Sequence, residues 1–437
     1  MTAGSRTLPR VTHTRLTVPP YGELPRLLPA GPGPVDLRAH LTTLGRPPYR
    51  GGPRLLTGSV EAAGLTGRGG AAFPVHRKLA AVARAGRRPV VFGNGAEGEP
   101  ASSKDRTLLW QSPHLVLDGL QLAAEAVGAR SAGLYVHRDA ALRQHLMTAM
   151  AQRAAAGVDK TAVELIEAPP RFLSGEESAL VGRINGGSAL PRYKQPPVFE
   201  KGIGGQPTLV QNVETLAHLA LIARFGAQWF RSLGTAQEPG SMLCTTLQAD
   251  DSRTVVETAL GTPLARLLAL GSDVQAVLCG GYHGAWLKTA AAARLSLRNA
   301  DLRPAGAFVG AGVLVALPED RCGLAETARV ARYLALESAG QCGPCVNGLP
   351  RIATGLAALA QPRPDPQILT DLRRWAGLVE GRGACHHPDG TVRFVRSALT
   401  VFAAEVDRHI QGTCTAASGR AFLPVPPETD LDESGWK

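Results

Sequence analysis

Long apolar runs are missing from this sequence. The longest, AFVGAGVLVAL from Ala307, has the length of a buried strand and falls well short of the roughly 18 to 20 residues that a membrane helix needs. The first residues, MTAGSRTLPRVTHTRLTVPP, contain arginines but no apolar stretch of the kind found in export signals. We therefore predict that the chain has no membrane span and lies in the cytoplasm.

Aromatic residues and lysines are also scarce. Aromatics make up 5% of the 437 residues, and most of the basic charge is arginine spread along the chain. A formal net charge of +11 would suit an anionic partner, but nucleic-acid-binding proteins usually combine a basic cluster with a recognisable motif. The sequence contains neither feature, so nucleic acid is not an expected partner. The phosphate of a cofactor is the better target for this charge.

Cysteine is sparse and odd in number. Seven cysteines in a long chain without an export signal argue against a disulfide framework and favour metal ligands or buried thiols in a reducing compartment. Cys244, Cys279 and Cys322 fall in apolar settings, so we expect them to be buried thiols, whereas Cys414 belongs to the tail. The remaining three lie in two loops, ESAGQCGPCVNG and GACHHPDG.

The pattern of expected elements divides the chain into five stretches. Residues 1–55 are rich in Pro, Gly and Arg and predict an irregular arm. Across 56–235, short β-like runs alternate with helical stretches, which predicts a parallel α/β sheet of doubly wound type. Residues 236–295 indicate a small second domain of strands and a short helix, and 296–411 contain amphipathic helices that predict a bundle. The polar, Pro-rich tail 412–437 is expected to be disordered.

A glycine-rich loop, GLTGRGGAAFPVHRKL from Gly64, is the first candidate site. Gly67, Arg68, Gly69 and Gly70 precede a predicted helix that carries Lys78. Glycines let backbone N–H groups turn toward an anion, and the start of a helix adds partial positive charge, so a phosphate fits here. The string is neither the dinucleotide-binding fingerprint nor a Walker loop, which leaves a structural turn as an equal alternative.

Two acidic motifs follow. FGNGAEGEPASSKDR places Asn94, Glu97 and Glu99 after a predicted strand, where open α/β sheets bind their ligands. Amides suit the polar edge of a flavin ring, and carboxylates can anchor ribose hydroxyls or a carboxamide. FLSGEESALVGRINGG adds Glu176 and Glu177 after a glycine. The alternative for each motif is a loop whose acids face water.

Two further polar motifs complete the set. PRYKQPP contributes Lys194, and QPTLVQNVETLAH contributes Gln211, Asn212 and Thr215 at the start of a predicted helix. Asn212 or Thr215 could cap that helix as well as bind a ligand. Each motif alone is a weak signal.

Together and in this order, the motifs resemble those of the NADH- and FMN-binding flavoprotein subunit of respiratory complex I, and of its relatives in soluble NAD-linked hydrogenases and formate dehydrogenases. The likeness extends over roughly residues 55 to 405. It implies a Rossmann-like FMN domain, a β-grasp domain that binds soluble ligands in other proteins, and a helical bundle with one [4Fe-4S] cluster. These three parts match the division drawn from the sequence pattern.

The resemblance also implies roles for individual residues. It implies that the FMN phosphate is bound by Gly67, Arg68, Gly69, Gly70 and Lys78. It also implies that the flavin ring and ribityl chain are bound by Asn94, Glu97, Asn212 and Thr215. The nicotinamide side falls to Glu99, Glu177, Lys194 and Phe73. We take Glu99 and Glu177 as the catalytic candidates and Glu176 as a further cofactor-binding candidate.

Several positions depart from the family pattern. Ala96 replaces an aspartate, Phe172 a tyrosine and Gln211 an asparagine, while Ala81 and Pro197 stand where two aromatics would enclose the adenine of NADH. Each lost stacking contact is worth about 1 kcal/mol or more, or roughly tenfold in affinity. We therefore expect FMN binding to be kept better than NADH binding.

The cysteine loop departs as well. Cys342, Cys345 and Cys385 match three of the four cluster ligands in the family pattern, but Ala339 stands in place of the first. Iron–sulfur clusters normally take four thiolates, although histidine can substitute. The candidates for the fourth ligand are His386, His387, Ser338 and solvent. A [4Fe-4S] or [3Fe-4S] cluster, a zinc site and an empty loop all remain open.

The function that the resemblance implies is that of an NADH dehydrogenase-like flavoprotein. NAD(P)H would deliver hydride to FMN, which converts it to single electrons for an iron–sulfur centre and a redox protein partner, either ferredoxin-like or another subunit. A non-catalytic scaffold subunit with a decayed cofactor site is the alternative, and flavin content would distinguish the two.

Overall fold

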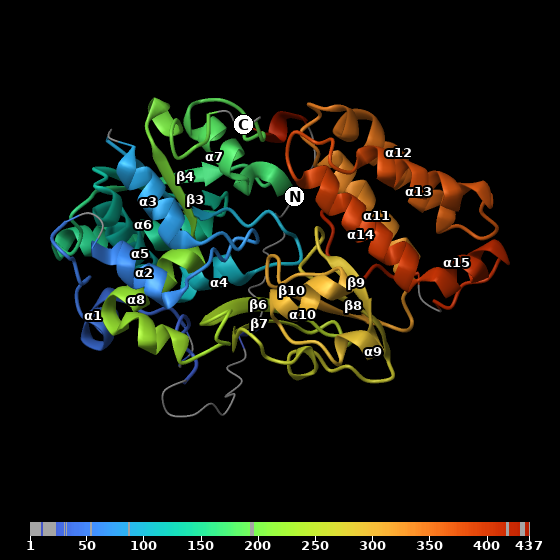
Figure 1. Ribbon diagram of the computed structural model, residues 1–437, viewed down its shortest axis with the longest axis horizontal. Helices are drawn as coiled ribbons and strands as arrows, with labels where there is room; N and C mark the ends of the chain where they lie inside the picture. The colour runs from blue at the N-terminus through green and yellow to red at the C-terminus, as the bar shows by residue number, and fades with distance from the viewer. Residues whose placement is uncertain are drawn as a thin grey trace.

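Figure 1 shows the computed structural model, which describes residues 10–11, 23–29, 31, 33–52, 55–85, 88–192, 196–416, 419–428 and 433–436. An α/β part formed by the first half of the chain lies beside a second sheet, and a group of helices formed by the last quarter packs above that sheet. The predicted fold class, a Rossmann-like α/β domain followed by a small second domain and a helical bundle, is confirmed.

The first sheet is parallel throughout. In the described chain it has four strands in the order β4-β3-β2-β5. Its strands are β2 (Val90–Gly95), β3 (Ser131–His137), β4 (Val163–Ala168) and β5 (Thr208–Asn212). Most residues of β2, β3 and β5 are buried, as expected for parallel strands covered on both faces.

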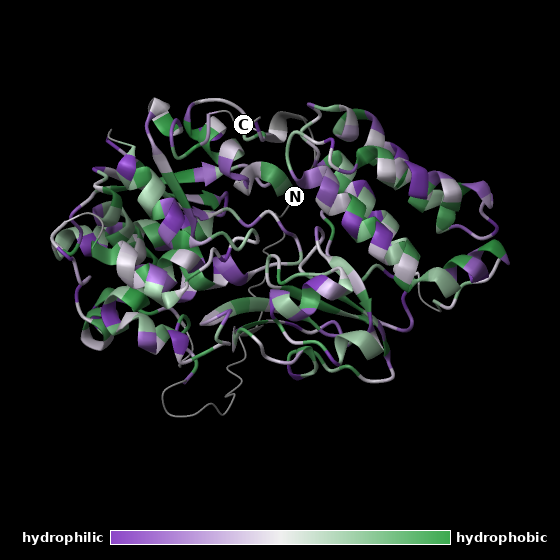
Figure 2. Ribbon diagram, viewed as in Figure 1, coloured by the Kyte–Doolittle hydropathy of each residue, from purple (hydrophilic) through white to green (hydrophobic). Residues whose placement is uncertain are grey.

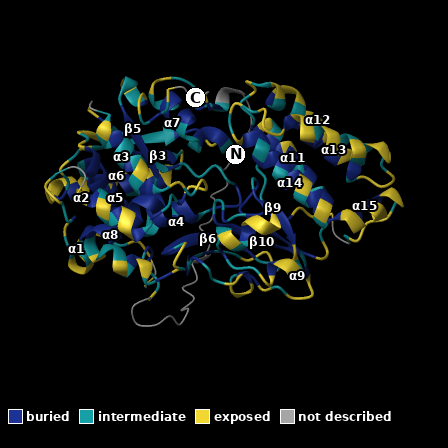
Figure 3. Ribbon diagram, viewed as in Figure 1, coloured by how far each residue is buried: buried dark blue, intermediate teal, exposed yellow. Residues whose placement is uncertain are grey.

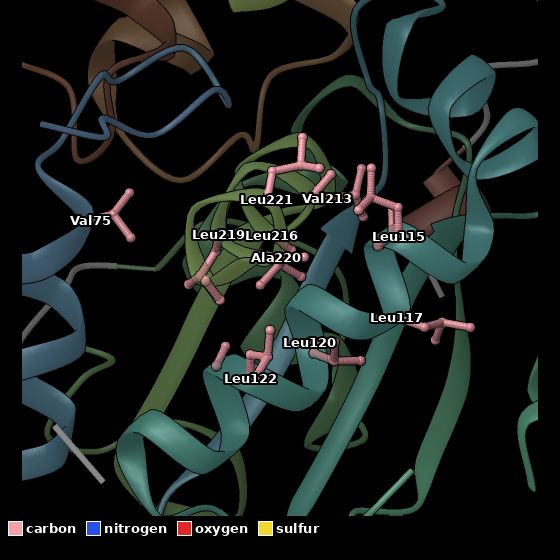
Figure 4. Close-up of a cluster of buried hydrophobic side chains, with 14 of the residues drawn as sticks. Val75, Leu115, Leu117, Leu120, Leu122, Val213, Leu216, Leu219, Ala220 and Leu221 are labelled. Carbon is pink, nitrogen blue, oxygen red and sulfur yellow. The ribbon is translucent and has the colours of Figure 1, made fainter. Parts of the chain in front are cut away.

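Helices cover both faces of this sheet. Their bounds are α2 (Leu55–Ala63), α3 (Val75–Arg84), α4 (Lys104–Gln111), α5 (Pro113–Val127), α6 (Ala140–Ala155), α7 (Glu177–Ile184) and α8 (Val213–Arg231). Leucines of α5 and α8 interlock in the core that Figure 4 shows in close-up. The two helices approach so closely at Gly119 that a Cβ there would lie 1.9 Å from the carbonyl oxygen of Leu216, so only glycine fits.

The second sheet is mixed, with the order β1-β7-β6-β10-β8-β9 among the described residues. Its strands are β1 (Arg10–Val11), β6 (Ser241–Leu247), β7 (Arg253–Ala259), β8 (Val274–Cys279), β9 (Ala285–Lys288) and β10 (Val313–Pro318), and the short helices α9 (Thr289–Ala292) and α10 (Asn299–Leu302) precede β10. The sheet extends past residue 295, where the sequence pattern suggested a boundary, because β10 returns between β6 and β8.

The N-terminal segment is more ordered than the expected irregular arm. Helix α1 (Leu37–Leu44) begins at Asp36, whose side chain accepts a hydrogen bond from the N–H of Ala39. Upstream of it, the backbone N–H groups of Arg26 and Leu27 donate to the buried carboxylate of Glu257 in β7, at 2.7 and 2.8 Å. A single carboxylate thus fastens residues 26–27 to the second sheet.

The last part is helical, as predicted. It contains α11 (Gly323–Leu336), a π-helical turn at Pro344–Gly348, α12 (Leu349–Leu359), α13 (Gln367–Val379), α14 (His387–Val401) and α15 (Ala403–Ile410). Hydrophilic and hydrophobic bands alternate along these helices in Figure 2, and Figure 3 shows exposed residues along α12, α13 and α15. None of the described helices is long and apolar enough to cross a membrane.

The tail differs from the expectation of disorder over the part that the structure describes. Phe422 and Leu423 are buried against the bundle, 6% and 2% exposed. Their N–H groups donate to the carboxylate of Glu326 on α11 at 3.0 and 2.8 Å. The polar, Pro-rich composition predicted disorder, but two apolar side chains and one buried acceptor are enough to dock this segment.

A second buried contact joins the α/β part to the bundle. Glu337, fully buried after α11, accepts a hydrogen bond from the N–H of Phe172 at 2.6 Å and lies 3.0 Å from Nε of Arg171. The ring of Phe172 contacts Tyr333 and His387 of the bundle, with ring centroids 6.0 and 5.7 Å away.

Candidate functional site

Residues from most of the predicted motifs meet at the carboxyl-terminal edge of the parallel sheet. Asn94 at the end of β2 pairs in register with Asn212 at the end of β5. The Asn94 side chain donates to the carbonyl of Gly175 at 2.7 Å, which brings in the segment that leads to Glu176 and Glu177. This is the position at which open α/β sheets bind ligands.

The glycine-rich loop is a closed turn above this edge. Gly67 N–H donates to the carbonyl of Phe73 at 2.9 Å, and Gly70 and Ala72 both adopt positive φ, 104° and 51°. Positive φ is costly for alanine, so the turn at Ala72 is held by its surroundings. The tip of the loop, Gly69 and Gly70, is exposed. These features describe a rigid loop with accessible backbone.

The same loop lies against the start of α8. A Cβ added at Gly69 would lie 3.4 Å from Cβ of Asn212, and the N–H of Arg68 donates to the hydroxyl of Thr215 at 2.9 Å. Asn212 caps α8 by accepting from the N–H of Glu214. The positive end of α8, which is helical as far as the break at Gly226, therefore points toward the loop, which favours an anion there.

Lys78 on α3 faces the same edge. Its Nζ lies 2.6 Å from the carboxylate of Glu177 and donates to the carbonyl of Val210 at 2.8 Å. Both side chains of the ion pair are partly exposed, 23% and 28%. The structure thus brings together the lysine expected at the phosphate and an acid expected at the nicotinamide, two residues about a hundred positions apart in sequence.

Gln211 carries a signal that the sequence did not give. It is 5% exposed, and its Nε2 has no hydrogen-bond partner among the described residues. An unsatisfied buried amide N–H costs about 1–3 kcal/mol unless a ligand or water accepts from it. Gln211 precedes Asn212 at the strand end, so this unpaired donor lies at the same edge of the sheet as the glycine loop. The sequence marked Gln211 as part of a weak polar motif and as a departure from the family pattern, but indicated no role for it.

The carboxylates of three predicted acids accept hydrogen bonds from backbone N–H groups. Glu97 accepts from Asp105 and Arg106 at the start of α4, and Glu176 caps α7 by accepting from Ser178 and Ala179. These bonds position the loops that carry the site. Whether either carboxylate also touches a cofactor remains a prediction.

Glu99, the third such acid, connects the α/β part with the second sheet. It accepts from the N–H of Tyr282 at 2.7 Å and from that of Ala101 at 3.2 Å. Burial raises the pKa of Glu99 to about 7, although both N–H groups oppose the shift. A carboxyl group that titrates near neutrality, next to a ligand-binding edge, is a candidate functional group.

A buried ionic cluster beneath the site was missed from the sequence. Lys104 Nζ lies 2.7 Å from Asp105 and 2.9 Å from Glu214, and all three are nearly inaccessible. Burial alone would raise the pKa of Glu214, but Lys104, His218 and Arg68 together outweigh it and lower the pKa to about 2. Asp105 in turn accepts from Nδ2 of Asn212 at 2.7 Å. The cluster holds Asn212 in place, and only the scarcity of lysine hinted at it.

Phe73 and Lys194 are the two predicted residues that remain. Phe73 is 52% exposed on the rim of the glycine loop, where a ring could stack on a ligand. Lys194 lies outside the described residues.

The three cysteines of the predicted cluster come together at one end of the bundle. Burial would raise the pKa of Cys342, but the N–H groups of Ala384 and Cys345 lower it below its usual value. Burial and the neighbouring Cys342 raise the pKa of Cys345 to about 12, and Cys385 adds to that shift. These mutual effects indicate that the three cysteines lie close to one another.

Their spacing bears on which metal group fits. A tetrahedral zinc ion would hold its sulfur ligands about 3.8 Å apart. Among the described residues, these cysteines do not form a group whose ligand atoms all lie within 4.8 Å of one another. Since the thiols of Cys342 and Cys345 hydrogen-bond to each other, Cys385 is the more distant sulfur, and the spacing alone does not separate a cluster from a zinc ion.

Both ring nitrogens of His387 have hydrogen-bonding partners other than the cysteines. Its Nε2 lies 2.8 Å from the carbonyl of Leu334 and its Nδ1 lies 3.0 Å from Nε2 of His283. Burial lowers the pKa of His387 to about 4, so the ring is neutral. With both ring nitrogens in use, His387 does not serve as the fourth cluster ligand, whereas His386 is exposed beside Cys385 and is still a candidate.

Two family models match the chain in the regions that carry these features. The model described as the Nuo51 FMN-binding domain matches residues 60–221, and the model of the NADH-ubiquinone oxidoreductase-F iron-sulfur binding region matches residues 325–409. The first contains the glycine loop and the sheet edge. The second contains all three clustered cysteines.

Whole proteins resemble the chain over most of its length. An F-type subunit of NADH-quinone oxidoreductase in Rhizobium meliloti (strain 1021) is 29% identical over 375 residues, which cover 80% of this chain and 88% of that protein. The F-type subunit of the same enzyme in Salmonella typhimurium (strain LT2) is 29% identical over 395 residues, 83% of this chain and 88% of that protein.

A solved structure gives the same result. A chain of an NAD+-reducing [NiFe]-hydrogenase in the H2-reduced state superposes with a TM-score of 0.75 at 29% identity. The match covers 83% of this chain and 63% of the hydrogenase chain. The hydrogenase chain therefore has additional parts that this match does not include.

Proposed function

Because this chain belongs to the flavoprotein family that includes the F-type subunits of NADH-quinone oxidoreductase, we propose that it oxidises NADH by way of FMN and an iron–sulfur centre. It acts as an electron-transfer subunit of a larger redox complex and passes electrons to a ferredoxin-like protein or another subunit. We place it in the cytoplasm. The observation that carries the proposal is the convergence of the glycine loop, the Lys78–Glu177 pair and the unpaired amide of Gln211 at one sheet edge.

The residues at this edge fit FMN. The exposed backbone from Gly67 to Gly70, with the N-terminus of α8 behind it, accepts the phosphate. Gln211 Nε2 donates to a ring carbonyl or nitrogen, which satisfies a donor that the protein leaves unpaired. When bound, FMN supplies the conversion between a two-electron hydride donor and single-electron transfer.

The nicotinamide side is formed by fewer groups. Phe73 offers a stacking surface, and Glu99, Glu177 and Lys194 orient the dinucleotide. Asn94, Glu97, Glu176, Asn212 and Thr215 hold the loops around the flavin. With one aromatic left of the family's set, NADH binds more weakly than in its relatives.

The FMN site is tested with Gln211→Leu. This variant removes the unpaired amide while keeping the side chain close in size, so the apoprotein should be equally or more stable, whereas FMN should bind about tenfold more weakly. Fluorescence titration of the apoprotein with FMN measures the affinity, and a thermal melt measures the stability. Gln361→Leu, at an exposed position after α12, is the matched control. If wild-type apoprotein takes up no FMN, the alternative of a flavin-free scaffold is correct.

The cluster is tested with Ala339→Cys. Cys342, Cys345 and Cys385 leave one position without a thiolate, and a non-thiolate ligand makes one iron more exchangeable and raises the reduction potential. Restoring the fourth thiolate should lower the potential of the anaerobically purified protein and slow its loss of iron. Redox titration monitored by electron paramagnetic resonance measures both effects. Absence of iron and sulfide from both proteins would rule out the cluster.

A further inference from the structure

A second group of potential metal ligands lies in the helical part, apart from the three clustered cysteines. It consists of Cys322 at the start of α11, Glu405 and His409 one turn apart on α15, and Cys414 just beyond that helix. The four ligand atoms all lie within 4.8 Å of one another. Cys322 and Cys414 fall outside the region 325–409 that matches the iron–sulfur model, so this group is a separate feature.

The distances within the group are those of a tetrahedral zinc site. Sγ of Cys322 lies 3.5 Å from Nε2 of His409, and Nε2 of His409 lies 3.3 Å from Oε1 of Glu405. With zinc bond lengths of about 2.3 Å to sulfur and about 2.0–2.1 Å to nitrogen or oxygen, a tetrahedron requires separations of about 3.6 and about 3.4 Å. The side chains would need almost no movement to accept the ion.

The histidine is oriented for coordination. Its Nδ1 lies 3.2 Å from the carbonyl oxygen of Leu359. A carbonyl only accepts hydrogen bonds, so Nδ1 carries the proton and the lone pair of Nε2 points into the group. This is the outer hydrogen bond that usually fixes the tautomer of a metal-ligating histidine.

The carboxylate is also held in place. Glu405 accepts from the N–H and hydroxyl of Thr415 and lies 3.1 Å from a guanidinium nitrogen of Arg408. Two thiolates, one carboxylate and a neutral imidazole around Zn²⁺ carry a net charge of −1, which Arg408 offsets. The bond from Thr415 also keeps the neighbouring Cys414 beside the group.

Burial distinguishes a structural site from a catalytic one. Cys322, Glu405 and His409 are buried, 9%, 5% and 3% exposed, whereas Cys414 is exposed and gives the ion a route of entry. Four protein ligands fill a tetrahedron and leave no open position for substrate. Thiolate, imidazole and carboxylate together favour zinc over magnesium or calcium, which prefer sets of oxygen ligands.

We propose that Cys322, Glu405, His409 and Cys414 bind one zinc ion that fastens the chain after α15 to the start of α11. The ion would tie together the two ends of the helical part, since Cys322 opens it and Cys414 follows its last helix. The plain alternatives are a hydrogen-bonded cluster without metal and a disulfide between Cys322 and Cys414.

The test uses the full chain, stripped with chelator under reducing conditions and then given zinc chloride alone. We expect about one tightly bound zinc per chain by mass spectrometry, also in Cys342→Ser/Cys345→Ser, which removes the competing thiols. In the protein lacking Cys342 and Cys345, the additional Cys322→Ser/Cys414→Ser substitutions should lower bound zinc at least tenfold. Cys414→Ser alone changes an exposed residue, so this variant should fold normally. Its affinity for zinc should still fall at least tenfold.

Cobalt gives an independent readout, because tetrahedral thiolate coordination produces a charge-transfer band and intense visible bands. Those bands should appear in the protein lacking Cys342 and Cys345 and disappear when Cys322 and Cys414 are replaced. Equal zinc in that protein with and without Cys322→Ser/Cys414→Ser would overturn the proposal. So would a Cys322–Cys414 disulfide in protein purified under reducing conditions.

Discussion

At the scale of single residues, Glu99 connects the candidate site to pH. Burial between the sheet edge and the Tyr282 loop raises its pKa to about 7. The folded state therefore binds the proton more tightly than the unfolded chain, in which the pKa lies near 4.5. The contribution of Glu99 to stability is thus fully present below about pH 4.5 and is lost as the pH rises through about 7.

We expect Glu99→Gln to remove this pH dependence. Between pH 5 and pH 8 the wild type should lose on the order of 1–2 kcal/mol more stability than the variant, since one pKa unit corresponds to about 1.4 kcal/mol. Thermal melts of the apoprotein at pH 5, 6.5 and 8 measure the difference. Glu319→Gln, at an exposed position, should keep the wild-type slope. Parallel slopes for wild type and Glu99→Gln would show that Glu99 does not titrate in this range.

At the scale of elements, the ion pair between α4 and α8 decides how the α/β part meets the second sheet. Lys104 on α4 holds Glu214 on α8 at 2.9 Å, and the other oxygen of Glu214 accepts from the N–H of Leu243 on β6. Three elements therefore depend on one buried carboxylate, whose charge is stabilised mainly by Lys104, with His218 and Arg68 contributing.

Lys104→Met is expected to destabilise the fold by about 3–5 kcal/mol, because it leaves the buried carboxylates of Asp105 and Glu214 without their shared lysine. Lys104→Met/Glu214→Leu should recover part of this loss, although the N–H of Leu243 then lacks its acceptor. Urea unfolding of the wild type and the two variants measures the loss of stability and how much of it the second substitution recovers. A double variant less stable than Lys104→Met alone would contradict the assignment of the loss to an unpaired charge.

The elements that the sequence predicted are those with a local signal. The alternation of strands and helices indicated the parallel sheet, and helical periodicity indicated the bundle. The sequence predicts a strand where β10 lies, but not its place in the second sheet, and it does not predict the docking of Phe422. Both depend on partners far away in sequence, namely β6, β8 and Glu326.

The candidate site follows the same rule. Motifs such as the glycine loop and Cys342-x-x-Cys345 have short internal spacing and can be recognised in the sequence. The group formed by Cys322 and Cys414 joins positions 92 residues apart, and the Lys104 cluster joins α4 with α8. Neither group therefore forms a short sequence motif that could be recognised. The unpaired amide of Gln211 is visible only in three dimensions, since it is defined by the absence of a neighbour among the described residues.

At the scale of the whole molecule, Glu337 couples the α/β part to the bundle. It is fully buried, accepts from the N–H of Phe172 and pairs with Arg171. Because this buried contact spans both parts, it helps to keep the predicted flavin and cluster sites in a fixed relation.

Glu337→Ala should loosen that relation. We expect a loss of about 3–5 kcal/mol, because Arg171 is left buried, and we expect the single calorimetric transition to broaden or split as the bundle separates earlier. Arg332→Ala, which breaks an exposed pair with Glu428, is the control and should change the transition by less than about 1 kcal/mol. A sharp, unshifted transition in Glu337→Ala would mean that apolar packing alone joins the two parts.

The carboxylate of Glu257, which fastens residues 26–27 to β7, also has a consequence for biosynthesis. Leu27 precedes its partner by 230 positions. At about 5–20 residues per second, a ribosome needs roughly 12–46 s to make the intervening chain. Throughout that interval Leu27 and Leu28, both buried in the finished protein, have no completed surface to cover them. The nascent chain should therefore expose an early binding site for chaperones, and it should lose that site only after β7 has left the exit tunnel.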